Sequence, residues 1–197
     1  MIQHPSLWVN ILIVVGESFW VFSISAQLVR LYRTRNTKGL APVSQTLNTT
    51  GNVGWATYFG INHLWFPFVT NTIMFFLSST TLGFTLSNRK KFARGLIAIA
   101  VIGPITAYVL ISNPDAGGWI GMLYNWVAGT PQLIKIVRHR KVSGLSPHGI
   151  YFAFAAMLCV LTYGFIIHSL PLVIGCVQGI IYETVVLRFF RLHRHSD

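Results

Sequence analysis

The chain has 197 residues, of which 53% are hydrophobic and only 10% are charged, and its mean hydropathy is +0.58. A soluble domain carries about 25% charged residues, so the composition excludes a water-soluble globular protein and indicates a chain solvated mainly by lipid. The formal net charge of +11 comes from short basic clusters that flank apolar segments. We therefore expect these clusters to face lipid headgroups, and we expect no nucleic-acid partner.

The basic clusters set the number of membrane spans. All 15 Lys and Arg residues fall into four clusters, at 30–38, 89–94, 135–141 and 188–194. At about 20 residues per span, one span fits before the first cluster and two spans fit in each of the three intervals between clusters. Seven spanning helices follow, predicted over residues 7–32, 42–61, 65–87, 92–112, 118–138, 147–167 and 170–191.

Seven spans place every basic cluster on one side of the membrane. The loops expected on the other side, near 61–66, 112–118 and 168–171, contain no Lys or Arg. The positive-inside rule then predicts an N-terminus outside and a cytoplasmic C-terminus. The tail shows no lysosomal or retention address, so we expect a plasma membrane or a bacterial inner membrane rather than an organelle.

An internal repeat predicts how the spans are organised. The segment QLVRLYRTRNTKGLAP at 27–42 recurs in altered form as QLIKIVRHRKVSGLSP at 132–147, at an offset of 105 residues. This offset maps the first three helices onto the last three and leaves the fourth without a counterpart. An odd helix between the copies lets both triplets share one orientation, which is a parallel repeat related by an axis along the membrane normal.

The predicted fold class is therefore all-α integral membrane, with two parallel three-helix bundles joined by a linker helix in a 3+1+3 arrangement. The predicted units are a first bundle at 1–91, a linker helix at 92–116 and a second bundle at 117–197 that ends in a short basic tail.

The repeat also carries a recognisable dipeptide. The second copy contains Pro131-Gln132, followed by the basic turn and Ser-Gly-Leu-Ser-Pro at 143–147. This arrangement resembles the PQ-loop superfamily, which includes the SWEET sugar transporters and the cystinosin-like transporters. The resemblance implies a transporter that moves a small polar solute, a sugar or an amino-acid-like metabolite, by alternating access. In the first copy the dipeptide is Ala26-Gln27, so its proline is missing.

Proline inside a helix removes one backbone hydrogen bond and clashes with the preceding turn. Pro131 therefore predicts a bend near the cytoplasmic end of the fifth helix, and a bend that tightens or relaxes can act as a gate. We take Pro131, Gln132 and Gln27 as the hinge or gating candidates. A static kink is the alternative, because proline kinks are common in membrane helices.

The resemblance also points to substrate-binding residues. SWEET-like pockets use a Trp on the second helix of a triplet and an Asn on the third, and Trp55 and Asn71 resemble that pair. The matching residues of the second copy are Val160 and Cys176, so the pocket is predicted to be asymmetric. Further amides at suitable depth are Asn48, Asn52, Asn125 and Gln178. Hydrogen bonding between helices is the alternative role for each amide.

Two acidic residues lie within predicted spans. Glu17 and Glu183 correspond to Met122 and Ser78 in the other copy, so neither acid is repeated. An intramembrane acid costs at least ~2.5 kcal/mol to insert, and such residues usually serve function. Both are proton-coupling candidates, since a carboxyl group in a low-dielectric cavity can bind and release a proton as access alternates.

The alternative for Glu183 is a structural one. Arg30, Lys135 and Arg188 are near its expected depth, so an ion pair or a hydrogen bond to a neighbouring helix is the competing interpretation.

No nucleophile–base pair, phosphate-binding loop or metal-binding spacing occurs in the sequence. We therefore expect no enzyme, no cofactor and no metal site. The competing function is a non-transporting receptor or scaffold with a PQ-loop fold, which would need basic residues in its cavity to hold a peptide carboxylate. A cavity without solute-sized volume would favour the scaffold. Expected partners are a small-molecule substrate and membrane lipid, and the sequence is compatible with a homo-oligomer.

Overall fold

The computed structural model describes residues 7–35, 37, 40–87, 89–139 and 146–192. Within these residues the chain forms helices and no strand, which confirms the all-α class, and the predicted helix bounds are wrong by at most three residues. The elements are α1 (Leu7–Thr34), α2 (Pro42–Ile61), α3 (Trp65–Leu86), α4 (Arg89–Ser112), the 3-10 turn η1 (Pro114–Ala116), α5 (Gly117–His139), α6 (Pro147–Ile166) and α7 (Leu170–Leu192).

Four segments among the described residues are long and apolar enough to cross a membrane by themselves: Leu7–Thr34, Phe92–Ser112, His148–Ile166 and Leu170–Phe189. The other long helices, α2, α3 and α5, have the same span-like length but carry more polar residues. In α2 and α3 many of these polar residues are buried inside the bundle, where they do not meet lipid. The protein is a multi-pass integral membrane protein.

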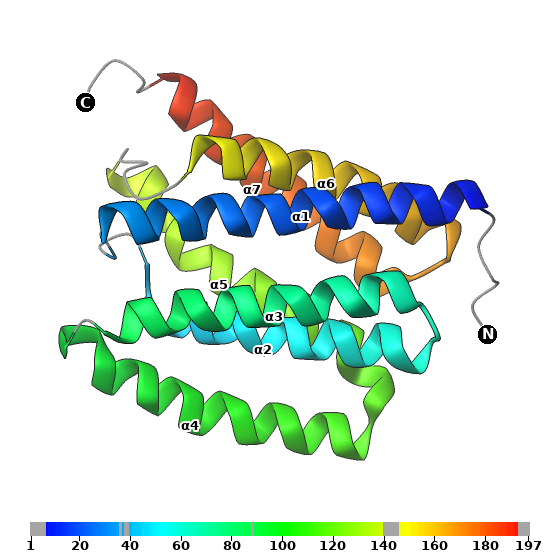
Figure 1. Ribbon diagram of the computed structural model, residues 1–197, viewed down its shortest axis with the longest axis horizontal. Coiled ribbons are helices and arrows are strands. Elements are labelled where there is room, and N and C mark those ends of the chain that lie inside the picture. The colour runs from blue at the N-terminus through cyan, green and yellow to red at the C-terminus, as the bar shows by residue number, and fades with distance from the viewer. Residues whose placement is uncertain (1–6, 36, 38–39, 88, 140–145, 193–197) are drawn as a thin grey trace.

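The seven α-helices lie roughly side by side along one long axis, and α1 begins at the end opposite to the one where α7 finishes (Figure 1). In each triplet the third helix packs against the other two: α3 contacts both α1 and α2, and α7 contacts both α5 and α6. Between the triplets, α1 packs against α6 and α2 packs against α5. The offset of 105 converts one of these interfaces into the other, so the triplets are parallel and related by a pseudo-twofold axis.

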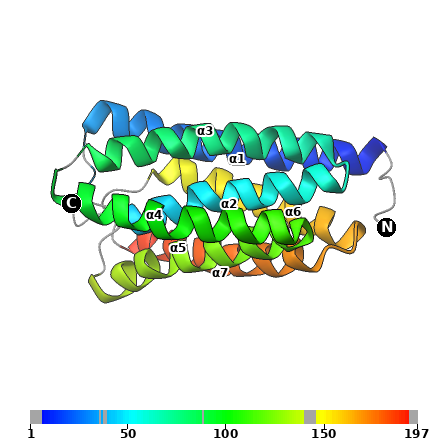
Figure 2. The same ribbon diagram turned by 90° about the horizontal axis from the view of Figure 1, so that it is seen from below.

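The helix without a repeat partner lies outside this arrangement. Helix α4 packs against α2 and α3 and lies along one edge of the bundle (Figures 1 and 2). A hydrogen bond of 2.8 Å between Thr106 Oγ1 and the Tyr124 hydroxyl ties it to α5. Its large apolar residues, such as Ile97 and Ile111, are exposed, as expected of a linker helix in contact with lipid.

The repeat extends to backbone geometry at the turns that follow α2 and α6. His63 and His168 occupy equivalent positions and adopt left-handed φ angles of 56° and 55°. In both turns the next residue donates its N–H five residues back, from Leu64 to the Phe59 carbonyl and from Ser169 to the Gly164 carbonyl, each at 2.9 Å. This is the Schellman pattern of a helix end, and it gives these two histidines a shared role in the turn.

Small residues bring the two triplets close together at equivalent points. A Cβ atom added to Gly16 of α1 would lie 2.8 Å from Cys159 Cβ of α6. A Cβ atom added to Gly121 of α5, the equivalent position, would lie 2.7 Å from the Trp55 ring of α2. Membrane helices approach closely where such residues replace larger ones, so both inter-triplet interfaces depend on a glycine at the same position of the repeat.

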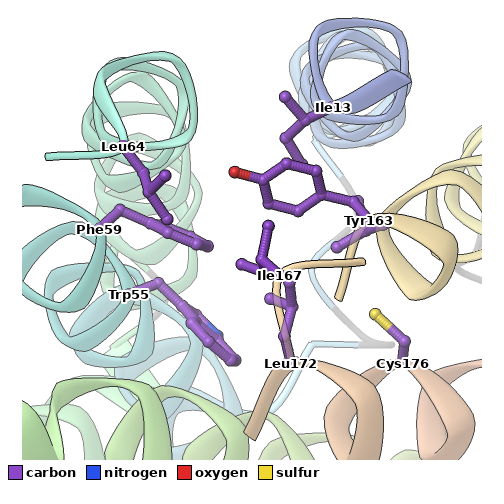
Figure 3. Packing of buried hydrophobic residues seen from close by; sticks show 9 residues of the cluster. Ile13, Trp55, Phe59, Leu64, Tyr163, Ile167, Leu172 and Cys176 are labelled. Carbon is purple, nitrogen blue, oxygen red and sulfur yellow. The ribbon is translucent and has the colours of Figure 1, made fainter. Parts of the chain in front are cut away.

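An apolar cluster fills one end of the bundle. It joins side chains from both triplets, among them Ile13, Phe59, Leu64, Tyr163 and Ile167, all of which are buried. Figure 3 shows these side chains pointing toward one another between the helices. The cluster lies at the end where α2 turns into α3 and α6 into α7. We call this the apolar end, and the opposite end, where α1, α5 and α7 finish with basic residues, the basic end.

Candidate functional site

A cavity of about 330 Å³ lies between the two triplets. Its described lining residues come from all six triplet helices and none comes from α4. The volume falls within the range of small-molecule sites, about 300–1,000 Å³. All six residues predicted to bind substrate lie in this wall, namely Asn48, Asn52, Trp55, Asn71, Asn125 and Gln178. The structure thus brings the predicted set together, and the substrate-binding role of each residue stays a prediction.

Trp55 occupies the apolar-end part of the cavity wall. Its ring stacks on Phe59, with centroids 5.7 Å apart and an interplanar angle of 21°. The side chain is 7% exposed and belongs both to the apolar cluster and to the cavity wall. An indole ring held by a stacked neighbour is a preorganised aromatic face for a flat or ring-shaped solute.

The amides of the first triplet have different hydrogen-bond partners. Asn71 donates from Nδ2 to the Pro67 carbonyl at 2.8 Å within its own helix. Asn52 donates from Nδ2 to Ser78 Oγ at 3.2 Å and so links α2 to α3. An amide has two donors and an acceptor oxygen, so each keeps capacity for a solute. For Asn52 the helix-linking alternative is also realised.

Both intramembrane acids line the cavity. Glu17 is 3% exposed and Glu183 is 8% exposed, and Oε2 of each is buried without a hydrogen-bond partner. Glu17 lies beside the side chains of Thr70 and Asn71 on α3. The cavity wall therefore contains carboxyl groups contributed by both triplets, one by α1 and one by α7.

The ion pair expected of Glu183 is not formed with either described candidate. Neither Arg30 nor Arg188 makes a salt bridge with it, and its Oε2 has no hydrogen-bond partner among the described residues. The side chain of Lys135, the third candidate, lies outside the described residues. The sequence-based interpretation was wrong for Arg30 and Arg188 because depth along a helix does not give the direction in which a side chain points.

The described cavity wall contains no Lys, Arg or His. A peptide carboxylate would meet no positive charge in this described wall. The chemistry of the wall thus disfavours the peptide receptor considered above. The cavity also has the volume of a small solute, whereas the scaffold interpretation expects a cavity without such a volume.

Gln27, the glutamine of the first repeat, lines the cavity near its basic end. Its Oε1 accepts a hydrogen bond of 3.2 Å from the backbone N–H of Ser146. Ser146 is the N-cap of α6 and accepts from the Gly149 N–H at 3.2 Å. Gln27 therefore links α1 of one triplet to the start of α6 in the other.

The other hinge candidates lie in α5. Pro131 and Gln132 are within this helix, but their side chains lie outside the described residues. Their gating role stays a prediction.

Several polar residues of the wall were not predicted from the sequence, including Trp20, Gln45, Ser78 and Thr81. A helical spacing of three and four residues would have found them. On α3 the lining residues are Asn71, Met74, Ser78 and Thr81, and on α2 they are Gln45, Asn48, Asn52, Trp55 and Phe59. Each set forms one stripe along a helix face.

The two sides of the cavity differ in chemistry. The polar stripe of α2 corresponds in α6 to Ile150, Ala153, Met157 and Val160. Every amide and the indole of that stripe therefore has an apolar counterpart. The asymmetry predicted from Trp55 and Asn71 extends along the whole helix, so a solute meets amides on one side of the cavity and mainly apolar groups on the side of α6.

The apolar end of the cavity is closed by contacts between the triplets. The Tyr58 hydroxyl lies 2.8 Å from Ser169 Oγ, which joins α2 to the turn before α7. The equivalent pair in the other direction is Tyr163 and Leu64, and Figure 3 shows the Tyr163 hydroxyl directed toward Leu64. Leucine cannot form a hydrogen bond, so the closure is polar on one side of the pseudo-twofold axis and apolar on the other.

Three comparisons with known proteins agree with this architecture. A family model described as "PQ loop repeat" matches residues 116–173. Over 73 residues the chain is 32% identical to "Sugar transporter SemiSWEET" of Escherichia coli (strain UMEA 3162-1), a match that covers 37% of this chain and 82% of that protein. The fold is similar to that in "The 3.7 A resolution structure of a eukaryotic SWEET transporter", with a TM-score of 0.71 at 11% identity over 96% of this chain and 100% of the other.

Proposed function

Because the chain belongs to the PQ-loop/SWEET family, we propose that it is a membrane transporter that moves a small polar solute by alternating access. The observation that carries this proposal is the cavity of about 330 Å³ between the two triplets, lined by amides, an indole and two carboxyl groups. Sites at the interface of repeats are typical of such transporters. The named relatives are transporters and not enzymes, and the chain is not an enzyme.

The proposed moving units are the two bundles, 1–91 and 117–197, with residues 92–116 as the linker. In the conformation described here, the apolar cluster and the contact between Tyr58 and Ser169 close one end of the cavity. Rocking of one triplet against the other about the α1–α6 and α2–α5 interfaces would open that end and close the basic end. We propose that the basic end faces the cytoplasm, at a plasma membrane or a bacterial inner membrane.

The proposed solute is a sugar or an amino-acid-like metabolite. Trp55 supplies a stacking face, and Asn71, Asn52 and Asn48 supply amides from the same side of the cavity. The relative named as a sugar transporter supports a sugar. Asn125 and Gln178 line the wall in the other triplet and complete the proposed binding set.

Proton coupling through Glu17 is the second element of the proposal. Glu17 is buried in the wall beside Thr70 and Asn71, so its protonation state would be felt by the amide that we assign to substrate binding. A carboxyl group at such a place can link proton release to solute release.

The alternative is a non-transporting receptor or scaffold with the same fold. Purified protein in proteoliposomes separates the two functions. Uptake of labelled D-glucose and L-alanine is measured against protein-free liposomes, with and without an imposed pH gradient. Saturable uptake of either solute supports transport. A folded, correctly inserted protein that moves no solute of a wider sugar and amino-acid panel would leave the scaffold as the better account.

A further inference from the structure

Glu183 is a buried carboxyl group for which the described protein supplies no partner. It lines the cavity at 8% exposure, and its Oε2 has no hydrogen-bond partner. No described side chain donates a hydrogen bond to it or forms an ion pair with it. Glu17 differs, because Thr70 and Asn71 lie beside it. Burying an ionised carboxylate without a partner is costly, so a hydrogen-bond donor or a cation that enters the cavity would stabilise the ionised form of this group.

The internal repeat explains why the partner is missing. The residue equivalent to Glu183 is Ser78, whose Oγ accepts the hydrogen bond from Asn52 Nδ2 at 3.2 Å. The residue equivalent to Asn52 is Met157, which also lines the cavity. A methionine side chain has no hydrogen-bond donor. In the second triplet the acceptor position therefore holds an acid, and the donor position opposite it holds a methionine.

The contacts around Glu17 show that side chains at equivalent positions of the two triplets meet in the same way. Glu17 lies beside Thr70, and the equivalent pair in the second triplet is Met122 and Gly175. A Cβ atom at Gly175 would lie 3.4 Å from Met122 Cγ. The side chains of α1 and α3 therefore meet at the same positions as those of α5 and α7.

The charge of the cavity wall limits which chemical groups could bind Glu183. The described wall holds two carboxyl groups and no Lys, Arg or His. A group that satisfies Glu183 has to donate hydrogen bonds, and a positive charge on it would offset the negative charge of the carboxylate. A protonated amino group meets both requirements, with three N–H donors and a compact charge.

We propose that Glu183 binds a protonated amino group of the transported solute. The substrate class is then an amine-bearing polar metabolite, such as an amino sugar or a diamine, rather than a neutral sugar. This inference rests on the proposed transport function and adds the chemical group that the site selects.

Ligand binding to the purified protein tests the site without requiring transport. Thermal stability in detergent is titrated with two matched pairs of probes, D-glucosamine against D-glucose and 1,5-diaminopentane against 1,5-pentanediol. Each pair differs only in amino groups that replace hydroxyl groups. We expect the amine of at least one pair to raise the wild-type Tm at about tenfold lower concentration than its hydroxyl partner, because hydrogen bonds to charged groups are worth about 1.5–3 kcal/mol.

Three variants assign the effect to Glu183. Glu183→Gln is expected to abolish the preference for the amine, whereas Asp115→Asn, at an exposed acid outside the cavity wall, is expected to keep it. Met157→Asn places an amide donor at the position equivalent to Asn52, and it is expected to weaken amine binding about tenfold while the carboxyl group is retained. Met157→Asn keeps the test decisive if Glu183→Gln folds poorly.

The outcomes are distinct. Equal response of the wild type to amine and hydroxyl probes, no response to either amine, or a preference that survives in both Glu183→Gln and Met157→Asn would overturn the amine site. Uptake of a neutral solute in proteoliposomes without an amine preference would overturn only this inference. Amine binding without any flux would overturn the transport function and keep the site.

Discussion

Gly121 of α5 lies directly against the indole ring of Trp55 in α2, so closely that a Cβ atom at position 121 would come within 2.7 Å of Cδ1 and Nε1. The ring also stacks on Phe59, with the ring centroids 5.7 Å apart. The position of the proposed stacking face in the cavity therefore depends on the absence of a side chain at residue 121.

The first prediction concerns this contact. Gly121→Ala should push the indole out of its present position and into the cavity, because the added methyl group has no other space. Overpacking of this kind costs about 1–3 kcal/mol of stability. We expect a lower Tm together with a loss of solute affinity of at least about tenfold, measured by ligand-induced thermal shift.

Gly16→Ala is the matched control. Its Cβ atom would lie 2.8 Å from Cys159 Cβ at the equivalent interface between α1 and α6. It should lower the Tm by a similar amount without displacing Trp55. Equal loss of affinity in the two variants would mean that general destabilisation, and not the position of Trp55, weakens binding.

The second prediction concerns closure of the apolar end. Tyr58→Phe removes the hydrogen bond to Ser169 that joins the triplets there. A hydrogen bond of this type contributes about 0.5–1.5 kcal/mol, so the population open at this end should rise about two- to tenfold. Cys176 belongs to the apolar cluster and lines the cavity, which makes it a native reporter of opening.

The measurement is the rate at which a membrane-impermeant thiol reagent, applied at the apolar end, modifies Cys176 in a Cys159→Ala background. Tyr163→Phe is the control, because Tyr163 faces Leu64 where Tyr58 faces Ser169. We expect faster labelling in Tyr58→Phe and a smaller change in Tyr163→Phe. An unchanged rate in Tyr58→Phe would remove this hydrogen bond from the account of gating.

The fold could be predicted from the sequence because the features that specify it, the basic clusters and the helix ends, occur in both copies of the repeat. The offset of 105 maps α2 at Pro42–Ile61 onto α6 at Pro147–Ile166 with no difference in length. Proline at the first helical position and a fixed turn after each helix specify these ends locally. Local chemistry of this kind can be recognised without knowledge of the tertiary structure.

The site was predictable only in part. Asn48 and Asn52 were found because polar groups at mid-depth stand out in an apolar helix, whereas Trp55 was found through the resemblance to SWEET-like pockets. The absence of a pair between Glu183 and either Arg30 or Arg188 was not predictable, because pairing depends on the rotation of α7 about its axis and on which helix faces it. The acceptor role of Gln27 toward Ser146 was also invisible in sequence, since it joins residues far apart in the chain.

The third prediction concerns proton coupling. If Glu17 binds and releases the coupled proton, Glu17→Gln should abolish the dependence of solute uptake on an imposed pH gradient and leave solute exchange without a gradient intact. Proteoliposome uptake at equal and unequal pH on the two sides measures both quantities. A gradient response that persists in Glu17→Gln would show that the proton is carried elsewhere.

The fourth prediction concerns a variant that removes one difference between the two copies of the repeat. Trp55→Val gives the first triplet the residue that the second triplet has at the equivalent position, Val160. The variant loses an aromatic stacking face, which is worth about 0.5–1.5 kcal/mol beyond the area it buries. It should therefore weaken solute binding about two- to tenfold or more. Trp65→Val is the control, since Trp65 is 61% exposed outside the cavity.

The most direct test of the central claim is counterflow in proteoliposomes that contain the wild-type protein, Trp55→Val or Trp65→Val. Liposomes preloaded with unlabelled solute, chosen as the best binder in the thermal-shift titrations, are diluted into labelled solute. Alternating access through the cavity predicts a transient accumulation of label with the wild type and Trp65→Val, and a strongly reduced one with Trp55→Val. Label that never exceeds the level of protein-free liposomes, with folded and ligand-binding protein present, would contradict a transport function.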